Sequence, residues 1–247
     1  MTRSVTEKPR RRGAASRRSL YTIGHSTRSV SEFIEILQAF SVTRLVDIRS
    51  ISRSRHNPQF NLDVLPAALE GAGIAYVHLA ALGGLRPRIK CVKECVNAGW
   101  ERRPFHNYAD YAETAPFREG LRELLEMAAR ETCAIMCAEV VWWRCHRRIV
   151  TDHVLSRGVP VVHLFTRTKG EPASVTSFAV IGSRGRVCYP APGAGAVALS
   201  ASRLGSAKTA KGPSVPCRST PMSRRPGRCS RRPESIRRST RPPARIG

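Results

Sequence analysis

Five short apolar runs alternate with segments of helical periodicity, and this alternation constrains the fold more than any other feature of the sequence. The runs are expected to be strands, at residues 20–24, 43–48, 74–79, 132–137 and 159–164. Nearly continuous apolar runs indicate strands buried on both faces, as in parallel sheets whose crossovers are helices. We therefore expect an α/β fold with a mainly parallel five-stranded sheet, Rossmann-like, with helices on both faces.

Apolar residues at helical spacing predict the crossovers between these strands. The expected helices lie within residues 29–40, 62–70, 108–130 and 144–156. Ser29 or Ser31 is expected to cap the first helix, because a side-chain oxygen there can accept a hydrogen bond from the first turn. Asn61 or Asp63 is expected to do the same for the second helix.

All of these periodic segments lie within residues 20–190, which we expect to form a single α/β domain. Inside it, residues 80–108 read as a longer irregular section, and sections of this length tend to be functional or mobile. An edge strand or hairpin is expected around residues 175–181 and 186–189.

The formal charge of +24 is typical of a nucleic-acid binder, but most of it lies at the two ends of the chain. Residues 1–20 hold seven Lys or Arg and one Glu, and residues 191–247 hold thirteen and one. Residues 1–19 and 191–247 lack hydrophobic periodicity, so both are expected to be disordered, basic extensions. A transit peptide is the alternative for the first extension, and an out-of-frame reading is the alternative for the tail after Pro192.

Eight cysteines occur without the features of a secreted disulfide framework. The chain is too long for such a framework, and no apolar segment follows its basic start as in a secretory signal. No run approaches the roughly 18 apolar residues that a membrane span requires. We therefore expect a cytoplasmic protein with reduced thiols and no membrane partner, and its oligomeric state is left open.

Polar side chains follow each expected strand at the point where the strand ends. They are His25 after the first strand, Asp47 and Arg49 at the second, His78 at the third, Cys137 and Glu139 at the fourth, and His163 at the fifth. The carboxyl ends of parallel strands share one edge of a sheet, and ligands of open α/β sheets bind along that edge. The pattern therefore predicts a ligand crevice there.

The segment from Cys137 to Arg148 gathers reactive groups where a strand leads into a helix. A helix N-terminus acidifies a nearby thiol, so Cys137 is interpreted as a thiolate, with a packed core cysteine as the alternative. On the helix that follows, His146 should face the sheet and Asp152 should lean outward. His146 is interpreted as a general acid or base or a donor to an anionic substrate, with a buried histidine bonded to a carbonyl as the alternative.

Two further interpretations of these groups are less favoured. Cys137 and Cys145 could form a redox pair, but their spacing is not Cys-x-x-Cys and the expected compartment is reducing. A mixed metal site would have to be built from His25, Asp47, His78 and His146. No metal ligand is assigned, and the cofactor is left unknown.

The segment Arg49–Arg55 carries three arginines interleaved with serines. Guanidinium groups match phosphate oxygens in pairs, and serine hydroxyls can add hydrogen bonds. Arg49, Arg53 and, from the later helix, Arg147 are therefore the candidate substrate-binding residues. A solvated loop is the alternative for this segment.

Several motifs, in order along the chain, resemble the domain of unknown function (DUF) 488 family. They include Tyr21-Thr-Ile-Gly-His-Ser26, Val46-Asp47-Ile-Arg49, Leu82-Gly-Gly84, Met136-Cys-Ala-Glu139 and Cys145-His-Arg147. The resemblance covers roughly residues 20–190 and implies an α/β domain with the motif residues His25, Asp47, Arg49, Cys137, Glu139, Cys145, His146 and Arg147. It implies a site and no reaction. Cys91 and Cys95 depart from the family pattern and are poor site candidates.

The leading hypothesis is a cytosolic enzyme that acts on a phosphate-bearing substrate, either a nucleotide or a nucleic acid. The candidate catalytic residues are His25, Asp47, Cys137, Glu139 and His146. One alternative is a non-catalytic nucleic-acid-binding module whose basic ends bind phosphate. Another is a metal- or thiol-dependent protein of unknown substrate.

Overall fold

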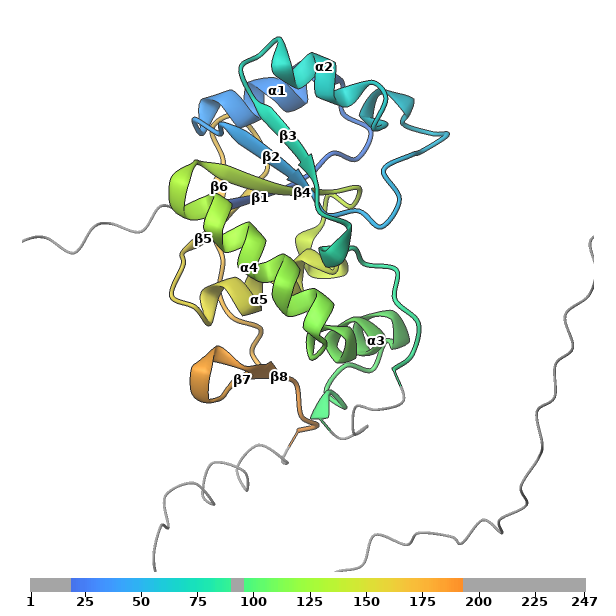
Figure 1. Ribbon diagram of the computed structural model, residues 1–247, viewed down its shortest axis with the longest axis vertical. Coiled ribbons are helices and arrows are strands. Elements are labelled where there is room, and N and C mark those ends of the chain that lie inside the picture. Colours follow the sequence, from blue (N-terminus) through green and yellow to red (C-terminus); the bar gives the residue numbers. More distant parts are fainter. Residues whose placement is uncertain (1–18, 90–95, 193–247) are drawn as a thin grey trace, which may run out of the picture. The chain divides into compact units, whose positions relative to one another are not determined.

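The computed structural model describes residues 19–89 and 96–192 of the 247-residue chain (Figure 1). They belong to one compact unit, Met1–Leu204, and a second unit, Gly205–Gly247, lies outside the described residues. The two ends that were expected to be disordered lie almost wholly outside the described part, so that expectation stays a prediction.

Six strands form the central sheet, in the order β3-β2-β4-β1-β5-β6. Their bounds are β1 Leu20–Gly24, β2 Arg44–Asp47, β3 Ala75–His78, β4 Cys133–Cys137, β5 Val161–Leu164 and β6 Gly170–Pro172. The first five are parallel, and β6 pairs with β5 in the antiparallel direction. The expected parallel sheet is therefore confirmed. The sequence did not indicate β6, because glycine and proline are rare in strands and a proline is tolerated only at an edge.

Five α-helices of the described residues surround this sheet. They are α1 Val30–Ala39, α2 Leu65–Glu70, α3 Arg103–Ala112, α4 Ala115–Arg130 and α5 Arg147–Leu155. Helices α1 and α2 cover one face and α4 and α5 the other, which confirms the Rossmann-like arrangement with helices on both faces (Figure 1). No helix in the described part of the chain is long and apolar enough to span a membrane.

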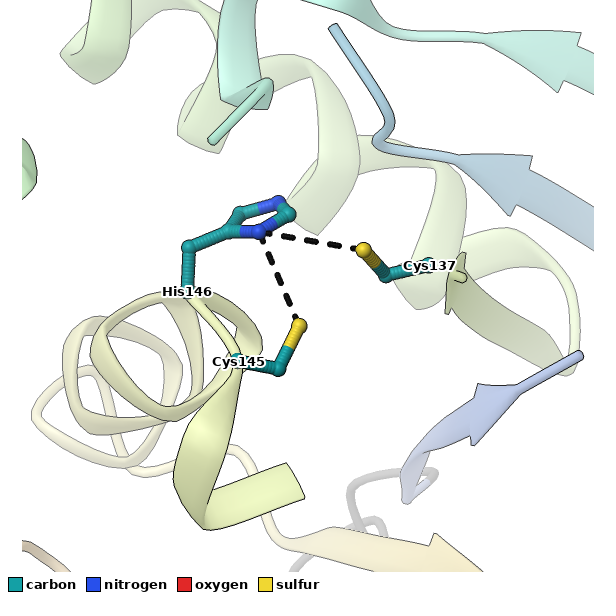
Figure 2. A group of neighbouring side chains, drawn as sticks. All are labelled: Cys137, Cys145 and His146. Atoms are coloured by element: carbon teal, nitrogen blue, oxygen red, sulfur yellow. Dashed lines mark hydrogen bonds between the residues drawn. The ribbon is translucent and has the colours of Figure 1, made fainter. Parts of the chain in front are cut away.

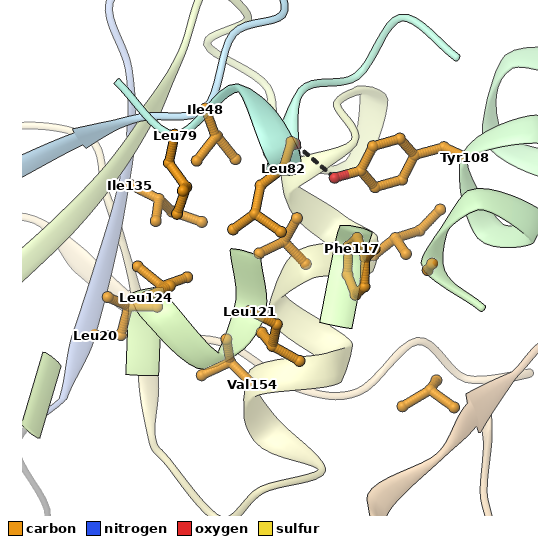
Figure 3. Packing of buried hydrophobic residues seen from close by; sticks show 14 of the residues in the cluster. Leu20, Ile48, Leu79, Leu82, Tyr108, Phe117, Leu121, Leu124, Ile135 and Val154 are labelled. Carbon is orange, nitrogen blue, oxygen red and sulfur yellow. Dashed lines mark hydrogen bonds between the residues drawn. The ribbon is translucent and has the colours of Figure 1, made fainter. Parts of the chain in front are cut away.

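The two faces of the sheet carry separate apolar cores, because successive strand residues point to opposite sides. On β4, Ile135 belongs to the core under α4 and α5, whereas Met136 belongs to the core under α1 and α2. Figure 3 shows the first of these cores, in which Phe117 and Leu124 of α4 are fully buried. This packing fixes the carboxyl edge of the sheet, where the polar side chains gather.

The N-terminal cap of α1 is the expected one, whereas that of α2 is not. Ser29 caps α1 and accepts a hydrogen bond from the backbone N–H of Glu32, as expected. The caps expected for the second helix are wrong, because α2 begins at Leu65 without a side-chain cap. Asn61 instead accepts a hydrogen bond from the backbone N–H of Ser54, at 2.6 Å, and so holds the loop before the helix.

The segment expected to be helical from Tyr108 to Arg130 consists of two helices, and the first already begins at Arg103, inside the section that was expected to be irregular. Each of them has a proline in its first turn, Pro104 in α3 and Pro116 in α4. Proline fits a first turn because no backbone donor is needed there, and it disfavours the helical conformation of the residue before it. One helix therefore ends at Ala112 and a new one begins at Ala115, with Pro116 in its first turn.

The expected hairpin is present as a separate two-stranded sheet, with β7 Val180–Ile181 antiparallel to β8 Val187–Cys188. The orientation expected for Asp152 is wrong. Its carboxylate is buried and accepts hydrogen bonds from the backbone N–H of Thr176, at 2.8 Å, and from the hydroxyl of Tyr189, at 2.9 Å. The segments on either side of the hairpin therefore cover the face of α5 that would otherwise meet solvent.

The strand order has a topological switch point at the centre of the sheet, where the connections leave in opposite directions. From β1 the chain passes through α1 to β2 on one side, and from β4 it passes through α5 to β5 on the other side of β1. Ligands of open α/β sheets bind outside the carboxyl ends of strands at such a switch point. The ends of β1 and β4 therefore mark the expected position of a site.

A fragment of residues 20–190 is expected to fold without the two ends, because every helix and strand of the described part lies inside it. Such a domain should unfold in one cooperative transition. Thermal unfolding followed by circular dichroism would check this. A fragment without a transition, beside a full-length chain that melts cooperatively, would show that the domain boundary is wrong.

Candidate functional site

The structure brings most of the predicted residues to the carboxyl edge of the sheet, but not all of them. His25 follows β1, Asp47 and His78 end their strands, and Cys137 ends β4. His163 is different, because it lies within β5 and is buried there. Its ring stacks on Trp142 with 4.3 Å between ring centroids.

Cys137, Cys145 and His146 form a compact cluster beyond the end of β4 (Figure 2). Nδ1 of His146 lies 3.8 Å from the sulfur of Cys137 and 3.6 Å from the sulfur of Cys145. On the other side of the ring, Nε2 donates a hydrogen bond to the backbone carbonyl of Ile48, at 3.0 Å. Because a carbonyl can only accept, Nε2 carries a proton, and Nδ1 faces the two sulfurs.

Two glycines permit this arrangement. A side chain at Gly84 would collide with the ring of His146, and one at Gly24 would collide with the backbone of Glu139 and Val140. Only a residue without a Cβ lets the loop after β4 approach the end of β1 so closely, and lets the Gly84 backbone pack on the ring. The sulfurs and the imidazole are therefore held by backbone on two sides.

The cluster forms part of the wall of an open cavity of about 300 Å³. The residues that line the cavity are Arg49, Ser50, Ile51, Gly84, Leu85, Pro104, Phe105, Cys137, Ala138, Glu139, Arg144, Cys145 and His146. Ile51 and Leu85 are strongly exposed at its rim, as are Glu139 and Arg144. The cavity therefore combines buried reactive groups with an accessible mouth that has both apolar and charged residues.

Arg147 lies directly behind the cluster and is almost completely buried. Its Nε donates to the sulfur of Cys145, at 3.4 Å, and Nη1 donates to the hydroxyl of Thr22, also at 3.4 Å. Nη2 donates to the backbone carbonyls of Glu139 and Val140. Because its guanidinium is used within the protein, Arg147 positions the loop after β4 and the Cys145 sulfur. Arg147 is not among the residues that line the cavity, and its expected contact with a substrate stays a prediction.

Arg49 and Asp47 form a second buried group, in which Nε and Nη2 of Arg49 both donate to the Asp47 carboxylate. Nη2 also donates to the carbonyl of Phe60, at 2.7 Å, and Tyr76 donates to Asp47, at 2.8 Å. Nη1 lies 3.3 Å from Nε2 of His25. Arg49 lines the cavity, while the Asp47 carboxylate is fully buried. Binding of a substrate by Arg49 stays a prediction.

His25 is a neutral member of this group. Its Nδ1 donates to the carbonyl of Ser26, so Nε2 accepts from Arg49. Burial, with the nearby charge of Arg49 acting in the same direction, lowers the pKa of His25 to about 4 despite the bond to Ser26. A ring that is buried and neutral at physiological pH is suited to positioning Arg49.

Arg53 is placed outside the cavity. Its side chain is 76% exposed and lies 3.9 Å from the carboxylate of Asp63, which is itself 63% exposed. A contact between Arg53 and a bound phosphate therefore stays a prediction, and it would require a substrate that extends past the cavity.

The pKa directions distinguish the two cysteines of the cluster. The hydrogen bond to Cys145 and burial together raise the pKa of the Cys137 thiol well above its usual range. Burial raises the pKa of Cys145, but the hydrogen bond from Cys137, the adjacent His146 and the charge of Arg147 outweigh burial and hold it well below the usual range. The thiolate expected at Cys137 is therefore favoured at Cys145, with Cys137 as its hydrogen-bond donor.

Cys145 was expected as a motif residue of the family resemblance and as a less favoured redox partner of Cys137, but it was not selected as a catalytic candidate. The expected helix began at Arg144, which put Cys145 inside it and Cys137 at its N-terminus. In the structure Trp142–Arg144 is a short 3-10 turn and α5 begins at Arg147, so Cys145 lies directly before the helix. The signal that could have found it is the Cys-His-Arg motif, which places three neighbouring polar groups at the start of the helix.

The donor atoms of the cluster are of types that soft metal ions bind. The two sulfurs and Nδ1 of His146 lie within 4.8 Å of one another. The mixed site of His25, Asp47, His78 and His146 is not assembled, because Asp47 is bound to Arg49 and Nε2 of His78 faces the carbonyl of Arg49, at 2.8 Å. Cys91 and Cys95 lie outside the described residues.

Replacing Arg147 by Lys is expected to lower the free energy of unfolding by at least about 3 kcal/mol, because an ammonium group keeps the buried charge but cannot reach all of the Arg147 partners. Urea denaturation would measure this. Arg148→Lys is the matched control, since Arg148 is only half-buried and, among the side chains that the structure describes, donates to Thr176 alone. An equal loss in both variants would contradict the role of Arg147.

Iodoacetamide is expected to label Cys145 faster than Cys137 or Cys133 in the metal-free protein at neutral pH. A lowered pKa keeps Cys145 as thiolate below about pH 8.5, where an ordinary thiol is protonated. Burial raises the pKa of Cys133 to about 11, which makes it the slow reference. Peptide mass spectrometry across a pH series would give the order of the labelling rates. Faster labelling of Cys137 than of Cys145 would contradict the prediction and indicate that Cys137 is the thiolate.

Comparison with known proteins identifies the family of the chain. The family model described as Domain of unknown function DUF488 matches residues 29–154, which is just over half of the chain. No curated protein and no solved structure matches. The matched residues include Asp47, Arg49, Cys137 and the Cys-His-Arg motif, so the family match contains the cavity and its reactive cluster. The chain belongs to the DUF488 family.

Proposed function

We propose that this protein is an enzyme that acts on a phosphate-bearing substrate, a nucleotide or a nucleotide unit of a nucleic acid, in the cavity at the carboxyl edge of the sheet. The observation that carries the proposal is the convergence of a thiol, an imidazole and a carboxylate on that cavity, from Cys145, His146 and Glu139. Perturbed pKa values and reactive groups in one concave place are typical of active sites.

In this proposal Cys145, His146 and Glu139 each have a chemical role. Cys145 and His146 form the reaction centre, because a thiolate beside an imidazole is a reactive pair whose proton can move between sulfur and Nδ1. Glu139 lies exposed at the cavity, and its carboxylate makes no ion pair within the described part of the chain. A carboxylate in this position can take up or deliver a proton to a bound substrate.

Arginine and apolar residues at the mouth suit the two parts of a nucleotide. Arg144 is exposed at the rim, and Nη1 of Arg49 makes only the contact to His25 among the described residues, so both can bind phosphate oxygens. Leu85 and Phe105 offer an apolar wall against which a base can pack. We propose this division of the cavity into a phosphate end and a base end.

A second hollow of about 570 Å³ continues from the cavity and shares Phe105 and Arg144 with it. Trp100, Trp143 and Arg148 line this hollow, and Trp143 is half exposed. Aromatic rings interleaved with arginines are the usual components of surfaces that bind single-stranded nucleic acid, since bases stack and phosphates pair. This supports a substrate longer than one nucleotide.

The proposed setting is the cytoplasm. Cys133, Cys137, Cys145 and Cys188 are free thiols in the structure. A reducing compartment would keep the thiols of Cys137 and Cys145 in that state, which the proposed chemistry requires.

Arg144→Ala is expected to weaken binding of a nucleotide about tenfold, the effect of losing one charge-assisted hydrogen bond. Isothermal titration with AMP, ATP and a short single-stranded oligonucleotide would measure it. Arg122→Ala is the matched control, because Arg122 is an exposed arginine on α4 that pairs with Glu119 and Glu126 away from the cavity. Equal affinities in the two variants would contradict the phosphate end.

Turnover separates an enzyme from a binding module. The same compounds, incubated with the protein and analysed for products by mass spectrometry, are expected to be converted by the natural chain and not by Glu139→Gln. The amide keeps the shape of the side chain but cannot exchange a proton. Binding by the natural chain without any product would favour the non-catalytic nucleic-acid-binding alternative.

A further inference from the structure

We infer that Cys137, Cys145 and His146 form a zinc site whose fourth position opens into the cavity. With Zn–S near 2.3 Å and Zn–N near 2.0 Å, tetrahedral coordination separates sulfur from nitrogen by about 3.5 Å. The two sulfur-to-Nδ1 distances are 3.6 and 3.8 Å, close to the spacing that the ion requires, and the two sulfurs lie within 4.8 Å of each other. The zinc site goes beyond the proposed enzyme activity and does not depend on it. In the zinc-bound chain Cys145 and His146 would be ligands, and the open position would replace their proton exchange as the reaction centre.

The orientation of His146 is the one that a zinc ligand needs. A ligating imidazole usually donates its other N–H to a carbonyl or carboxylate, which fixes the tautomer and the plane of the ring. Nε2 of His146 makes this bond to the carbonyl of Ile48, at 3.0 Å, and Gly84 packs against the ring. Nδ1 therefore presents its lone pair to the space between the sulfurs without rearrangement.

Charge and hydrogen bonding favour zinc in this place. Two thiolates and one zinc ion are neutral together, which suits a buried cluster. The backbone N–H and Nε of Arg147 both donate to the sulfur of Cys145, at 3.5 and 3.4 Å, and such bonds stabilise a metal-bound thiolate. Sulfur and imidazole donors select zinc over magnesium or calcium, which prefer oxygen.

The fourth position is the feature that makes the site more than structural. All three ligands line the cavity, and Glu139 lines it as well without belonging to the donor cluster. Structural zinc sites are closed by four protein ligands, whereas catalytic sites keep one position for water or substrate. The site therefore has the open form, with a carboxylate beside the open position.

The test begins with the metal content of the full chain. Elemental analysis of the purified protein is expected to give one zinc ion per chain. After the metal is removed with a chelator, the protein should bind Zn²⁺ again in an isothermal titration. Cys137→Ser and Cys145→Ser should each weaken zinc binding more than about 100-fold, the upper end of the effect of losing an outer hydrogen-bond partner. Cys133→Ser and Cys188→Ser are the matched controls and should bind normally.

Two measurements keep the test valid if a variant does not fold. The natural chain loaded with Co²⁺ should show the sulfur-to-metal charge-transfer absorption of a tetrahedral thiolate site. Zinc should also protect Cys137 and Cys145, but not Cys188, from iodoacetamide. Zinc that is retained in both cluster variants, or a chain that takes up no zinc and labels at the same rates with and without it, would overturn the site.

Failure of the site and failure of the proposed function give different results. Stoichiometric zinc with no nucleotide binding or turnover would leave the metal site in place and remove the proposed substrate. Nucleotide turnover by a chain that takes up no zinc would remove the metal site and leave a thiol enzyme.

Discussion

A buried guanidinium without a carboxylate partner is the constraint on which the site depends. Arg147 is almost completely buried, and its partners within the described residues are backbone carbonyls, one hydroxyl and the sulfur of Cys145. A buried cation is costly unless an anion compensates it. In the metal-free protein, a thiolate at Cys145 supplies that charge. The same contact therefore stabilises the fold and holds the sulfur in its reactive state.

The sheet and its carboxyl edge could be predicted from the sequence because their signals are local. An apolar run reports a buried strand, and the residue after it lies at the edge of a parallel sheet wherever the strand is placed. Cys145 could not be found in this way. Its role depends on where the helix begins, and the 3-10 turn at Trp142–Arg144 that shifts this start is set by packing of the loop, including the stacking of Trp142 on His163. Asp152 was misplaced for a related reason, because the segment that buries it is 24 residues away.

Residue type alone also could not separate arginines that bind substrate from arginines that build the site. A guanidinium fits a phosphate and a carboxylate equally well, so the sequence offers the same evidence for both roles. Burial decides between them: Arg49 is bound to Asp47 and the carbonyl of Phe60, and Arg147 is bound to the loop after β4, whereas Arg144 is exposed at the rim. In the proposed function, the anion-binding role therefore passes mainly to Arg144, which the sequence did not select for it.

These assignments describe a site built in two layers with different physical requirements. The inner layer contains paired charges, Arg49 with Asp47 and Arg147 with Cys145, and His25 remains neutral there because burial lowers its pKa to about 4. A second cation beside Arg49 would repel it in a medium of low dielectric constant, so neutrality of His25 is a condition for the pair to stay intact. The outer layer, with Glu139 and Arg144, is exposed and accessible to a ligand. Because the inner layer fixes the positions of the sulfurs and the imidazole, substrate choice is left to the outer layer and to the hollow that continues from it.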